Sequence, residues 1–281
     1  MAEADGPDWQ ARPFLKWAGG KRQLLPQILE RFPPSCATYY EPFLGSGALF
    51  FALAGRRAFR RAVLSDRNRD LVDTYVAVRD RLDDLVAALR ALHADRDSYY
   101  RIRALDPQSL DPAARAARFI YLNRTCYNGL YRVNRAGRFN VPFGRYAKPR
   151  ILHEENLRAV SRALRRADLL SGDFDEATTA ARAGDAIYFD PPYVPLSATA
   201  RFTAYDAAPF GWEEQRRLAA LMHRLADRGV FALLSNAGSG PARDLYGSLS
   251  CDRVHARRSI NSRADRRGHV PEILVRTRAE L

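Results

Sequence analysis

The sequence predicts an α/β protein with a parallel sheet and a helical insert. Short apolar segments typical of strands, each followed by a turn and a helix-forming stretch, occur near both ends of the chain. The stretch between them is helical and basic in character. We therefore expect one domain made of residues 1–70 and 151–281, interrupted by a helical insert at residues 71–150.

The individual elements follow from hydrophobic periodicity and turn residues. We expect a helix at 48–53 behind a glycine-rich turn, and an amphipathic helix around 218–225. Apolar residues spaced four and three apart predict one long helix from Leu71 to Leu92. Strand-type segments lie at 38–41, 62–65, 186–189, 230–235 and 273–275.

The charge of the chain points to a polyanionic partner. The 281 residues carry a formal net charge of +13. Residues 101–150 contain eleven Arg or Lys and two acidic residues, which gives 11 − 2 = +9 in that stretch. Tyrosines and phenylalanines are interleaved with these cations, a combination suited to phosphates and unstacked bases, although solvated charged faces are the simpler alternative. A second basic run comprises Arg253, Arg257, Arg258, Arg263, Arg266 and Arg267.

Cysteine usage and hydropathy exclude other classes of protein. Cys36, Cys126 and Cys251 are too widely spaced for a metal-ligand pair and do not form an even disulfide set. No apolar run approaches the ~20 residues of a membrane-spanning helix. We therefore expect no bound metal, no membrane association and a cytoplasmic location.

The first motif is EPFLGSG at 41–47, with Asp66 at the end of the next strand-type segment. Glycines at a strand-to-helix turn let the backbone approach a ligand, and an acid about 20 residues later can bind ribose hydroxyls. A dinucleotide site would need a third glycine where this chain has Phe50. The pattern favours an adenosine ligand without a pyrophosphate, such as S-adenosylmethionine, and an ordinary tight turn is the alternative.

The second motif is DPPY at 190–193, directly after an apolar strand-type segment. The adenine amino nitrogen is a poor nucleophile because its lone pair is delocalised, and two hydrogen-bond acceptors would localise it. A loop with a capping aspartate is the structural alternative. The motif offers a carboxylate, a fixed backbone carbonyl, a stiff turn and a ring for stacking a base taken out of the duplex, at Asp190, Pro191, Pro192 and Tyr193 respectively.

The third motif is FLKWAGGK at 14–21. A phosphate-binding P-loop is excluded, because Leu15 stands where that loop needs glycine and Arg22 where it needs Ser or Thr. Trp17 and Lys21 remain as side chains that could cover a methionine moiety and pair with its carboxylate.

The fourth motif is the Gly- and Asn-rich segment 123–150. Asparagine pairs with adenine edges and arginine with guanine edges, and Tyr127 could wedge or stack between bases. Caps and turns are the alternative for each asparagine taken singly. The candidate base readers are Asn128, Asn134, Asn140, Arg132 and Arg138.

At these segments the sequence resembles the DNA adenine methyltransferases of the Dam type. FLKWAGGK, EPFLGSG, NRTCYNGLYRVNRAGRFNVPFGRYAKP, DPPY and PLSATARFTAY match family segments in the same order, and the resemblance runs from about Arg12 to Val275. DPPY alone is shared with other amino-group methyltransferases, whereas 123–149 and 195–205 are much more specific. Tyr131 and Val133, which flank Arg132, depart from the family pattern.

The resemblance implies a Rossmann-like, seven-stranded methyltransferase sheet with a helical target-recognition insert. It also implies S-adenosyl-L-methionine as cofactor and double-stranded DNA as partner, with base flipping of the adenine in 5′-GATC, and we expect a monomer. The catalytic residues would be Asp190, Pro191, Pro192 and Tyr193. The cofactor would contact Trp17, Lys21, Glu41, Asp66 and Asp190. The DNA would contact Lys16, Tyr127, Asn128, Leu130, Arg132 and Pro142.

Other functions fit the sequence less well. RNA or protein amino-group methyltransferases more often carry Asn in place of Asp190, and they lack a recognition insert. A cytosine-C5 methyltransferase needs a cysteine nucleophile, usually after proline, and no cysteine here follows proline. A catalytically silent DNA-binding protein would not need an intact DPPY, and a nuclease would need clustered metal-binding acids near a lysine.

Overall fold

The computed structural model describes residues 10–17, 19, 21, 23–193, 210–238, 240–257 and 269–277. The specific segment at 195–205 and Arg258, Arg263, Arg266 and Arg267 of the basic run lie outside these residues. The chain divides into two compact units. Unit 1 comprises residues 1–20, 45–57 and 68–169, and unit 2 comprises residues 21–44, 58–67 and 170–281. These units are defined by contacts, so the functional division at residues 70 and 150 stays a prediction.

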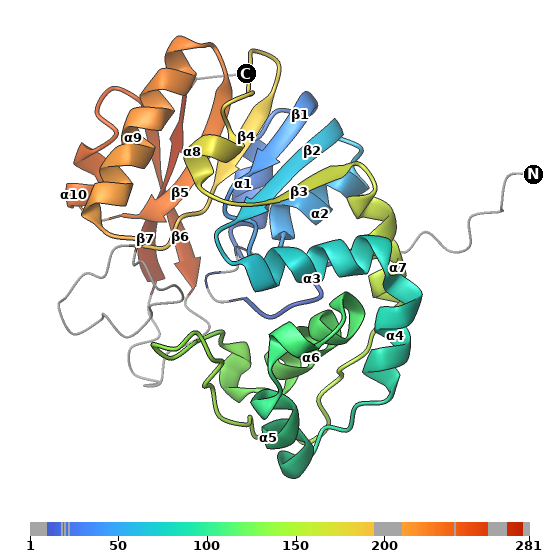
Figure 1. Cartoon of the computed structure of the whole chain (residues 1–281). Helices are drawn as coiled ribbons and strands as arrows, with labels where there is room; N and C mark the ends of the chain where they lie inside the picture. Colours follow the sequence, from blue (N-terminus) through green and yellow to red (C-terminus); the bar gives the residue numbers. More distant parts are fainter. Residues whose placement is uncertain are drawn as a thin grey trace, which may run out of the picture. The chain divides into compact units, whose positions relative to one another are not determined.

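The centre of the fold is a sheet of seven strands: β1 (Cys36–Glu41), β2 (Phe59–Asp66), β3 (Ala167–Ser171), β4 (Ala186–Phe189), β5 (Phe231–Ala237), β6 (Ser250–Arg257) and β7 (His269–Arg276). Their order is β3-β2-β1-β4-β5-β7-β6 (Figure 1). β1 pairs in parallel with β2 and β4, β4 pairs in parallel with β5, and β7 runs antiparallel to β5 and β6. The predicted α/β class with a mostly parallel sheet is confirmed.

Strands β4 and β5 of unit 2 are mostly apolar because helices and loops cover both of their faces. All residues of β4 and β5 are buried, as expected for parallel strands in the middle of a sheet. On one face, Leu218 and Met222 of a helix pack with Ile187 and Leu234 of the strands. The alternate residue Phe231 meets Phe32 edge-on at 5.4 Å on the opposite face. The helices of unit 2 are α1 (Leu25–Arg31), α8 (Phe174–Ala177), α9 (Trp212–Asp227) and α10 (Gly240–Asp244).

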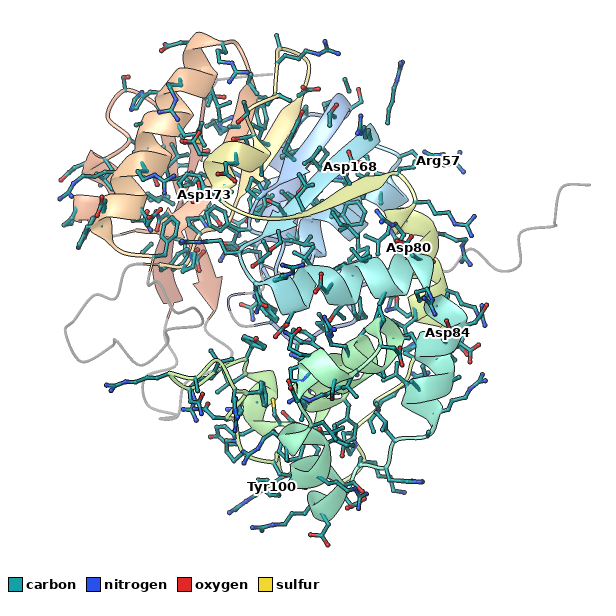
Figure 2. All side chains as sticks on the ribbon, in the orientation of Figure 1. Arg57, Asp80, Asp84, Tyr100, Asp168 and Asp173 are labelled. Carbon is teal, nitrogen blue, oxygen red and sulfur yellow. The ribbon has the colours of Figure 1, made fainter. Side chains whose placement is uncertain are left out.

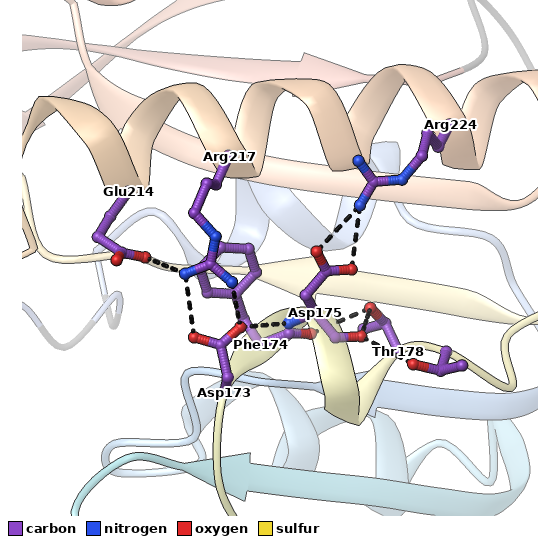
Figure 3. Close-up of polar contacts among 8 residues, drawn as sticks. Asp173, Phe174, Asp175, Thr178, Glu214, Arg217 and Arg224 are labelled. Atoms are coloured by element: carbon purple, nitrogen blue, oxygen red, sulfur yellow. Dashed lines mark hydrogen bonds and ion pairs between the residues drawn. The ribbon is translucent and has the colours of Figure 1, made fainter.

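Ion pairs fasten α8 to α9 (Figure 3). Arg217 of α9 bonds to both Asp173 and Glu214, and its guanidinium carbon lies 5.0 Å from the centre of the Phe174 ring. Two turns further along, Arg224 donates to both carboxylate oxygens of Asp175 at 3.0 Å. Such exposed pairs contribute at most about 1 kcal/mol each, so the network mainly fixes the position of α9 relative to α8.

Unit 1 is mostly helical. Three of its helices begin at acid or amide caps, in which Asn68, Asp95 and Asp111 accept hydrogen bonds from backbone amides of the first turn. None of the helices among the described residues of the chain has the length and apolar character needed to cross a membrane. The elements are α2 (Ala48–Gly55), α3 (Arg69–Asp80), α4 (Leu82–Arg90), α5 (Arg96–Ala104), η1 (Pro107–Ser109), α6 (Pro112–Thr125), η2 (Tyr127–Gly129) and α7 (Glu154–Leu164).

The single long helix predicted from Leu71 to Leu92 is wrong, because the chain forms α3 and α4 there. The helix breaks at Arg81, whose φ of −132° and ψ of 38° are not helical. Both helices contact α6, and the change of direction at Arg81 lets each of them do so. The hydrophobic spacing survives a one-residue break, which is why periodicity alone did not reveal it.

Candidate active site

Three acidic residues end neighbouring parallel strands in unit 2. Glu41 is the last residue of β1, Asp66 is the last residue of β2, and Asp190 follows β4. Because β2, β1 and β4 are adjacent and parallel, their carboxyl ends meet at one edge of the sheet, where α/β proteins bind ligands. Glu41 is only 3% exposed, and its carboxylate accepts a hydrogen bond of 2.8 Å from the hydroxyl of Tyr39.

The carboxylate of Asp190 is anchored through one of its two oxygens. Oδ1 lies 2.8 Å from the Lys21 ammonium and accepts a 2.9 Å hydrogen bond from Ser235 Oγ. Both of these contacts are made to Oδ1. The side chains of Lys21 and Asp190 are 10% and 20% exposed, so the pair is largely shielded from water. One oxygen of Asp190 is thus fixed and the other is available to a ligand.

Tyr193 lies beside the same ion pair. The Lys21 ammonium is 4.5 Å from the centre of the Tyr193 ring, and the tyrosine hydroxyl donates a 2.6 Å hydrogen bond to Glu272 Oε2 on β7. Burial, together with the charges of Asp190 and Glu272, raises the pKa of Tyr193 well above its usual value. The tyrosine is therefore a neutral donor, held at its hydroxyl end by Glu272.

Trp17 lies in an aromatic cluster of unit 1. Its ring is 5.8 Å from Tyr131 and 6.4 Å from Phe119, in stacked orientations. Gly45, at a φ of +47°, packs against the same indole, where a Cβ on this glycine would lie 2.8 Å from Trp17 Cδ1. The Tyr131 hydroxyl donates to Asp70 at 3.0 Å. The structure thus gives Trp17 a fixed position within unit 1, and its contact with a cofactor stays a prediction.

The charged side chains at this edge of the sheet in unit 2 fit the chemistry of S-adenosylmethionine. That molecule carries ribose hydroxyls, an ammonium and a carboxylate, for which Asp66, Glu41 and Lys21 are complementary partners. A metal would need a different set, and the described residues contain no group of three His, Cys, Asp or Glu side chains able to hold an ion.

The predicted DNA-contacting residues gather around η2 in unit 1. Tyr127 is 50% exposed, and its backbone amide donates to the carbonyl of Pro142 at 2.9 Å. Asn128 is exposed and has a φ of 54°, an uncommon value for a residue other than glycine. Gly129 packs on Lys16, where an added Cβ would come within 2.5 Å of Lys16 Cβ. η2 therefore presents a tyrosine and an asparagine to solvent above a buried glycine.

Lys16 is held from several sides. Its backbone amide donates to Asn123 Oδ1 at 2.8 Å, and Asn123 Nδ2 donates back to the carbonyl of Lys16 at 2.6 Å. Its ammonium lies 3.8 Å from the centre of the Tyr146 ring. The FLKWAGGK segment is thereby attached to α6 and to the loop that follows it. Leu130 packs against the apolar cluster formed by Tyr99, Tyr121 and Val141.

Residues 131–141 form a small hairpin that carries Arg132. Val133 and Phe139 make an antiparallel bridge, and Asn134 Oδ1 accepts bonds from two backbone amides of the turn. Asn134 therefore has the turn-capping position that the sequence left open as the alternative. Arg132 is exposed and donates to Asn140 Oδ1 at 2.7 Å and to the Asn140 carbonyl at 3.3 Å. The guanidinium fork is thus held at the surface by its own loop.

Helix α5 supports this hairpin from within unit 1. Tyr99 donates to the carbonyl of Val141 at 2.8 Å, and Arg103 donates to the same carbonyl at 3.1 Å. The guanidinium carbons of Arg103 and Arg96 lie 4.7 and 5.7 Å from the centre of the Tyr100 ring, which Figure 2 labels on α5. Besides Arg132, the exposed cations of the loop are Arg135, Arg138, Arg145, Lys148 and Arg150.

Several residues of the site were missed by sequence reasoning. Ser235 contacts Asp190, Glu272 contacts Tyr193, Gln215 contacts Pro192, and Asn123 contacts Lys16. A signal existed only for Ser235, which with its neighbour Asn236 forms a polar pair at the end of an apolar strand. Such a pair in a fully buried strand needs hydrogen-bond partners, and the nearest are in the loop at the same sheet edge.

Comparison with known proteins gives consistent matches. The family described as D12 class N6 adenine-specific DNA methyltransferase matches residues 17–260. The chain is 39% identical over 272 residues to the type II methyltransferase M1.LlaDCHI of Lactococcus lactis subsp. cremoris, with 94% of each chain covered. It is 40% identical over 276 residues to the type II methyltransferase M.MjaIII of Methanocaldococcus jannaschii, covering 92% of this chain and 96% of the relative. It is 41% identical over 270 residues to the DNA adenine methylase of Escherichia coli strain K12, with 94% of each covered.

Proposed function

Because the chain belongs to the D12 class of N6 adenine-specific DNA methyltransferases, we propose that it methylates the adenine of 5′-GATC in duplex DNA, with S-adenosylmethionine as methyl donor and with flipping of the target base. The predicted family, enzyme class and DNA substrate are confirmed by the family match. The donor, the sequence site, the duplex state of the DNA and the base flipping are the proposal.

The observation that carries the proposal is the anchored carboxylate of Asp190. Oδ1 is held by Lys21 and Ser235, which leaves Oδ2 to accept one amino hydrogen of adenine. The carbonyl of Pro192 already accepts a hydrogen bond from Gln215 at 3.1 Å. We assign the carbonyl of Pro191 as the acceptor for the second amino hydrogen. Two fixed acceptors draw the nitrogen lone pair out of conjugation with the ring.

The remaining residues hold the two reactants. S-adenosylmethionine would supply an electrophilic methyl group, with its carboxylate paired to Lys21 and its ribose hydroxyls bonded to Asp66. The face of the Tyr193 ring would stack against the flipped adenine. The amino nitrogen loses one proton as it is methylated, and Asp190 is the acceptor already hydrogen-bonded to it.

Recognition of the DNA sequence is assigned to unit 1. Arg132 would read a guanine with the fork that Asn140 holds at the surface, and Tyr127 and Asn128 would enter the base stack from η2. The exposed arginines that follow would bind phosphates, which fix the register without reading bases. The 5′-GATC target itself rests on the resemblance to the Dam type at residues 123–149 and 195–205.

The test is methylation of defined oligonucleotides by the purified protein. A duplex with one 5′-GATC site is incubated with S-adenosylmethionine, and the nucleosides are analysed by mass spectrometry. The matched control has the same base composition with the site scrambled, and a second control is the single strand. N6-methyladenine in the GATC duplex alone supports the proposal. Equal methylation of the scrambled duplex contradicts the site, and exclusive methylation of the single strand contradicts the duplex substrate.

A further inference from the structure

Two consecutive residues of β5 support the DPPY loop from opposite faces of the sheet. Ser235 and Asn236 are 0% and 1% exposed and follow the apolar run Phe231–Leu234. Their side chains point to opposite faces because successive residues of a strand alternate. Buried polar groups in such a strand destabilise the fold unless they are hydrogen-bonded. Ser235 bonds directly to Asp190, and Asn236 bonds to Gln215, which in turn bonds to Pro192.

The Ser235 side forms a chain of three hydroxyl and carboxyl groups. Ser235 Oγ lies 3.0 Å from the hydroxyl of Tyr188 and 2.9 Å from Asp190 Oδ1. An ionised carboxylate only accepts hydrogen bonds, so Ser235 donates to Asp190 and accepts from Tyr188. Tyr188 can serve as that donor because burial and the charge of Asp190 raise its pKa well above the usual value. The direction of every bond in the chain is therefore determined.

The Asn236 side ends on the next part of the loop. Asn236 Nδ2 donates to Gln215 Oε1 at 2.9 Å and to the Tyr246 hydroxyl at 3.2 Å. Its Oδ1 accepts from the amide of Ala237 at 2.8 Å, which fixes the orientation of the side-chain amide. Gln215, with its oxygen engaged, donates through Nε2 to the carbonyl of Pro192 at 3.1 Å. One of the two lone pairs of this carbonyl is thereby engaged within the protein.

We propose that Ser235 and Asn236 are positioning residues for methyl transfer. They determine which two hydrogen-bond acceptors of the DPPY loop face the adenine amino group. Ser235 engages Oδ1 of Asp190 so that Oδ2 faces the substrate. Asn236, acting through Gln215, engages the carbonyl of Pro192 so that the carbonyl of Pro191 faces it. The inference rests on the proposed function, in which Asp190 accepts an amino hydrogen.

The experiment measures single-turnover methylation with DNA and S-adenosylmethionine both saturating. Ser235→Ala should slow the reaction about tenfold or more, since hydrogen bonds to charged groups are worth that much. Tyr188→Phe, which keeps its shape, should slow it less. Gln215→Met, which fills the same space without a donor, should also slow it. Affinities for DNA and cofactor should stay at the wild-type values in all three variants.

A pH profile separates positioning from a general loss of stability. In Ser235→Ala the acidic limb of the rate profile should move to higher pH, because the charged carboxylate has lost a donor. The matched control is Thr277→Ala, since Thr277 Oγ1 makes two hydrogen bonds to the other end of β5, at 2.7 and 2.8 Å. Thr277→Ala should lower the melting temperature and leave the rate and the profile unchanged.

The inference is overturned if folded Ser235→Ala and Gln215→Met react at the wild-type rate, or if Thr277→Ala slows the reaction as much as they do. If Ser235→Ala does not fold, Tyr188→Phe and Gln215→Met decide the question in the same way. Asp190→Ala distinguishes a failure of the positioning roles from a failure of the proposed mechanism. A slow Asp190→Ala with fast Ser235 and Gln215 variants removes only the positioning roles, whereas a fast Asp190→Ala removes the proposed mechanism itself.

Discussion

The ammonium of Lys21 lies 2.8 Å from Oδ1 of Asp190, so a residue of the glycine-rich third motif contacts the first residue of DPPY. The same ammonium lies 4.5 Å from the centre of the Tyr193 ring. One lysine therefore contacts both the acid and the ring that are proposed to receive adenine. This contact joins two motifs that lie far apart in the sequence and that were both predicted to contact the cofactor. It gives Lys21 a role in orienting Asp190 in addition to its proposed pairing with a cofactor carboxylate.

Removal of the Asp190 carboxylate should abolish most of the activity. Asp190→Ala and Asp190→Asn should each lower the single-turnover rate by on the order of a hundredfold or more, since a positioned proton acceptor is worth that much. The matched control is Asp175→Asn, which removes a carboxylate bonded to Arg224 on the surface of unit 2. The control should react at the wild-type rate. Near-normal turnover in both Asp190 variants at saturating cofactor would remove Asp190 from the chemistry.

Asp66 should contribute to cofactor affinity rather than to turnover. Asp66→Ala should weaken the binding of S-adenosylmethionine in calorimetric titration, because the ribose hydroxyls lose a charged acceptor worth about 1.5–3 kcal/mol. Asp80→Ala serves as the control, since its carboxylate is exposed and pairs with the neighbouring Arg79. Circular dichroism checks that both variants are folded. An unchanged affinity in Asp66→Ala would place this residue outside the cofactor site.

Alanine substitutions at Arg132 and at Arg150 should have different effects on methylation, one on sequence specificity and the other on DNA affinity. Arg132→Ala should relax specificity by about 1–3 kcal/mol, so that sites with one altered base pair are methylated relatively better. Arg150→Ala, at an exposed position after the loop, should weaken all sites alike and flatten the salt dependence of binding. The measurement is kcat/KM on 5′-GATC and its single-substitution variants at two salt concentrations. A uniform loss across all sites in Arg132→Ala would make it a phosphate contact.

The buried thiol of Cys126 should make the protein less stable at alkaline pH. Burial raises the pKa of Cys126 from 9.0 to about 11, so the folded state favours the neutral thiol. This contribution is complete below pH 9 and is lost as the pH rises from 9 to 11, by on the order of 2 kcal/mol. In Cys126→Ala the free energy of unfolding should fall less steeply over that range.

Some alkaline loss should remain in that variant, because burial also raises the pKa of Cys36 to about 11 and the pKa of Tyr188 and Tyr193 well above the usual value. Thr125→Ala is the matched control, since Thr125 is buried on the same helix and does not titrate. Denaturant unfolding at several pH values measures the slope. A slope in Cys126→Ala equal to those of Thr125→Ala and the wild type would show that the thiol does not contribute.

The sequence predicted the central strands well and the edge strands poorly. β4 and β5 contain short apolar runs because both faces are covered, and their patterns were read correctly, as was the position of β1. β3 and β6 were missed, and they are the two edges of the sheet. An edge strand is partly exposed and carries polar residues, as in the Ala167–Ser171 segment, so it lacks a clear apolar pattern.

Within the candidate site, local chemistry was predictable and distant partners were not. Asp66 and Asp190 were identified because each directly follows a strand-type segment. The partners Ser235 and Glu272 come from β5 and β7, far away in the chain, and their positions follow from strand order rather than from any local pattern. Strand order depends on pairing between segments that are distant in the chain, and no local pattern in a single sequence reveals it.

The most direct test of the account is a map of modified adenines in living cells. The wild-type chain and Asp190→Ala are expressed separately in a host that lacks adenine methylation, and the DNA is sequenced by a method that detects N6-methyladenine. We expect modification of the adenine in 5′-GATC throughout the genome with the wild-type chain, and none with Asp190→Ala. Modification at another sequence, or equal modification with Asp190→Ala, would contradict it.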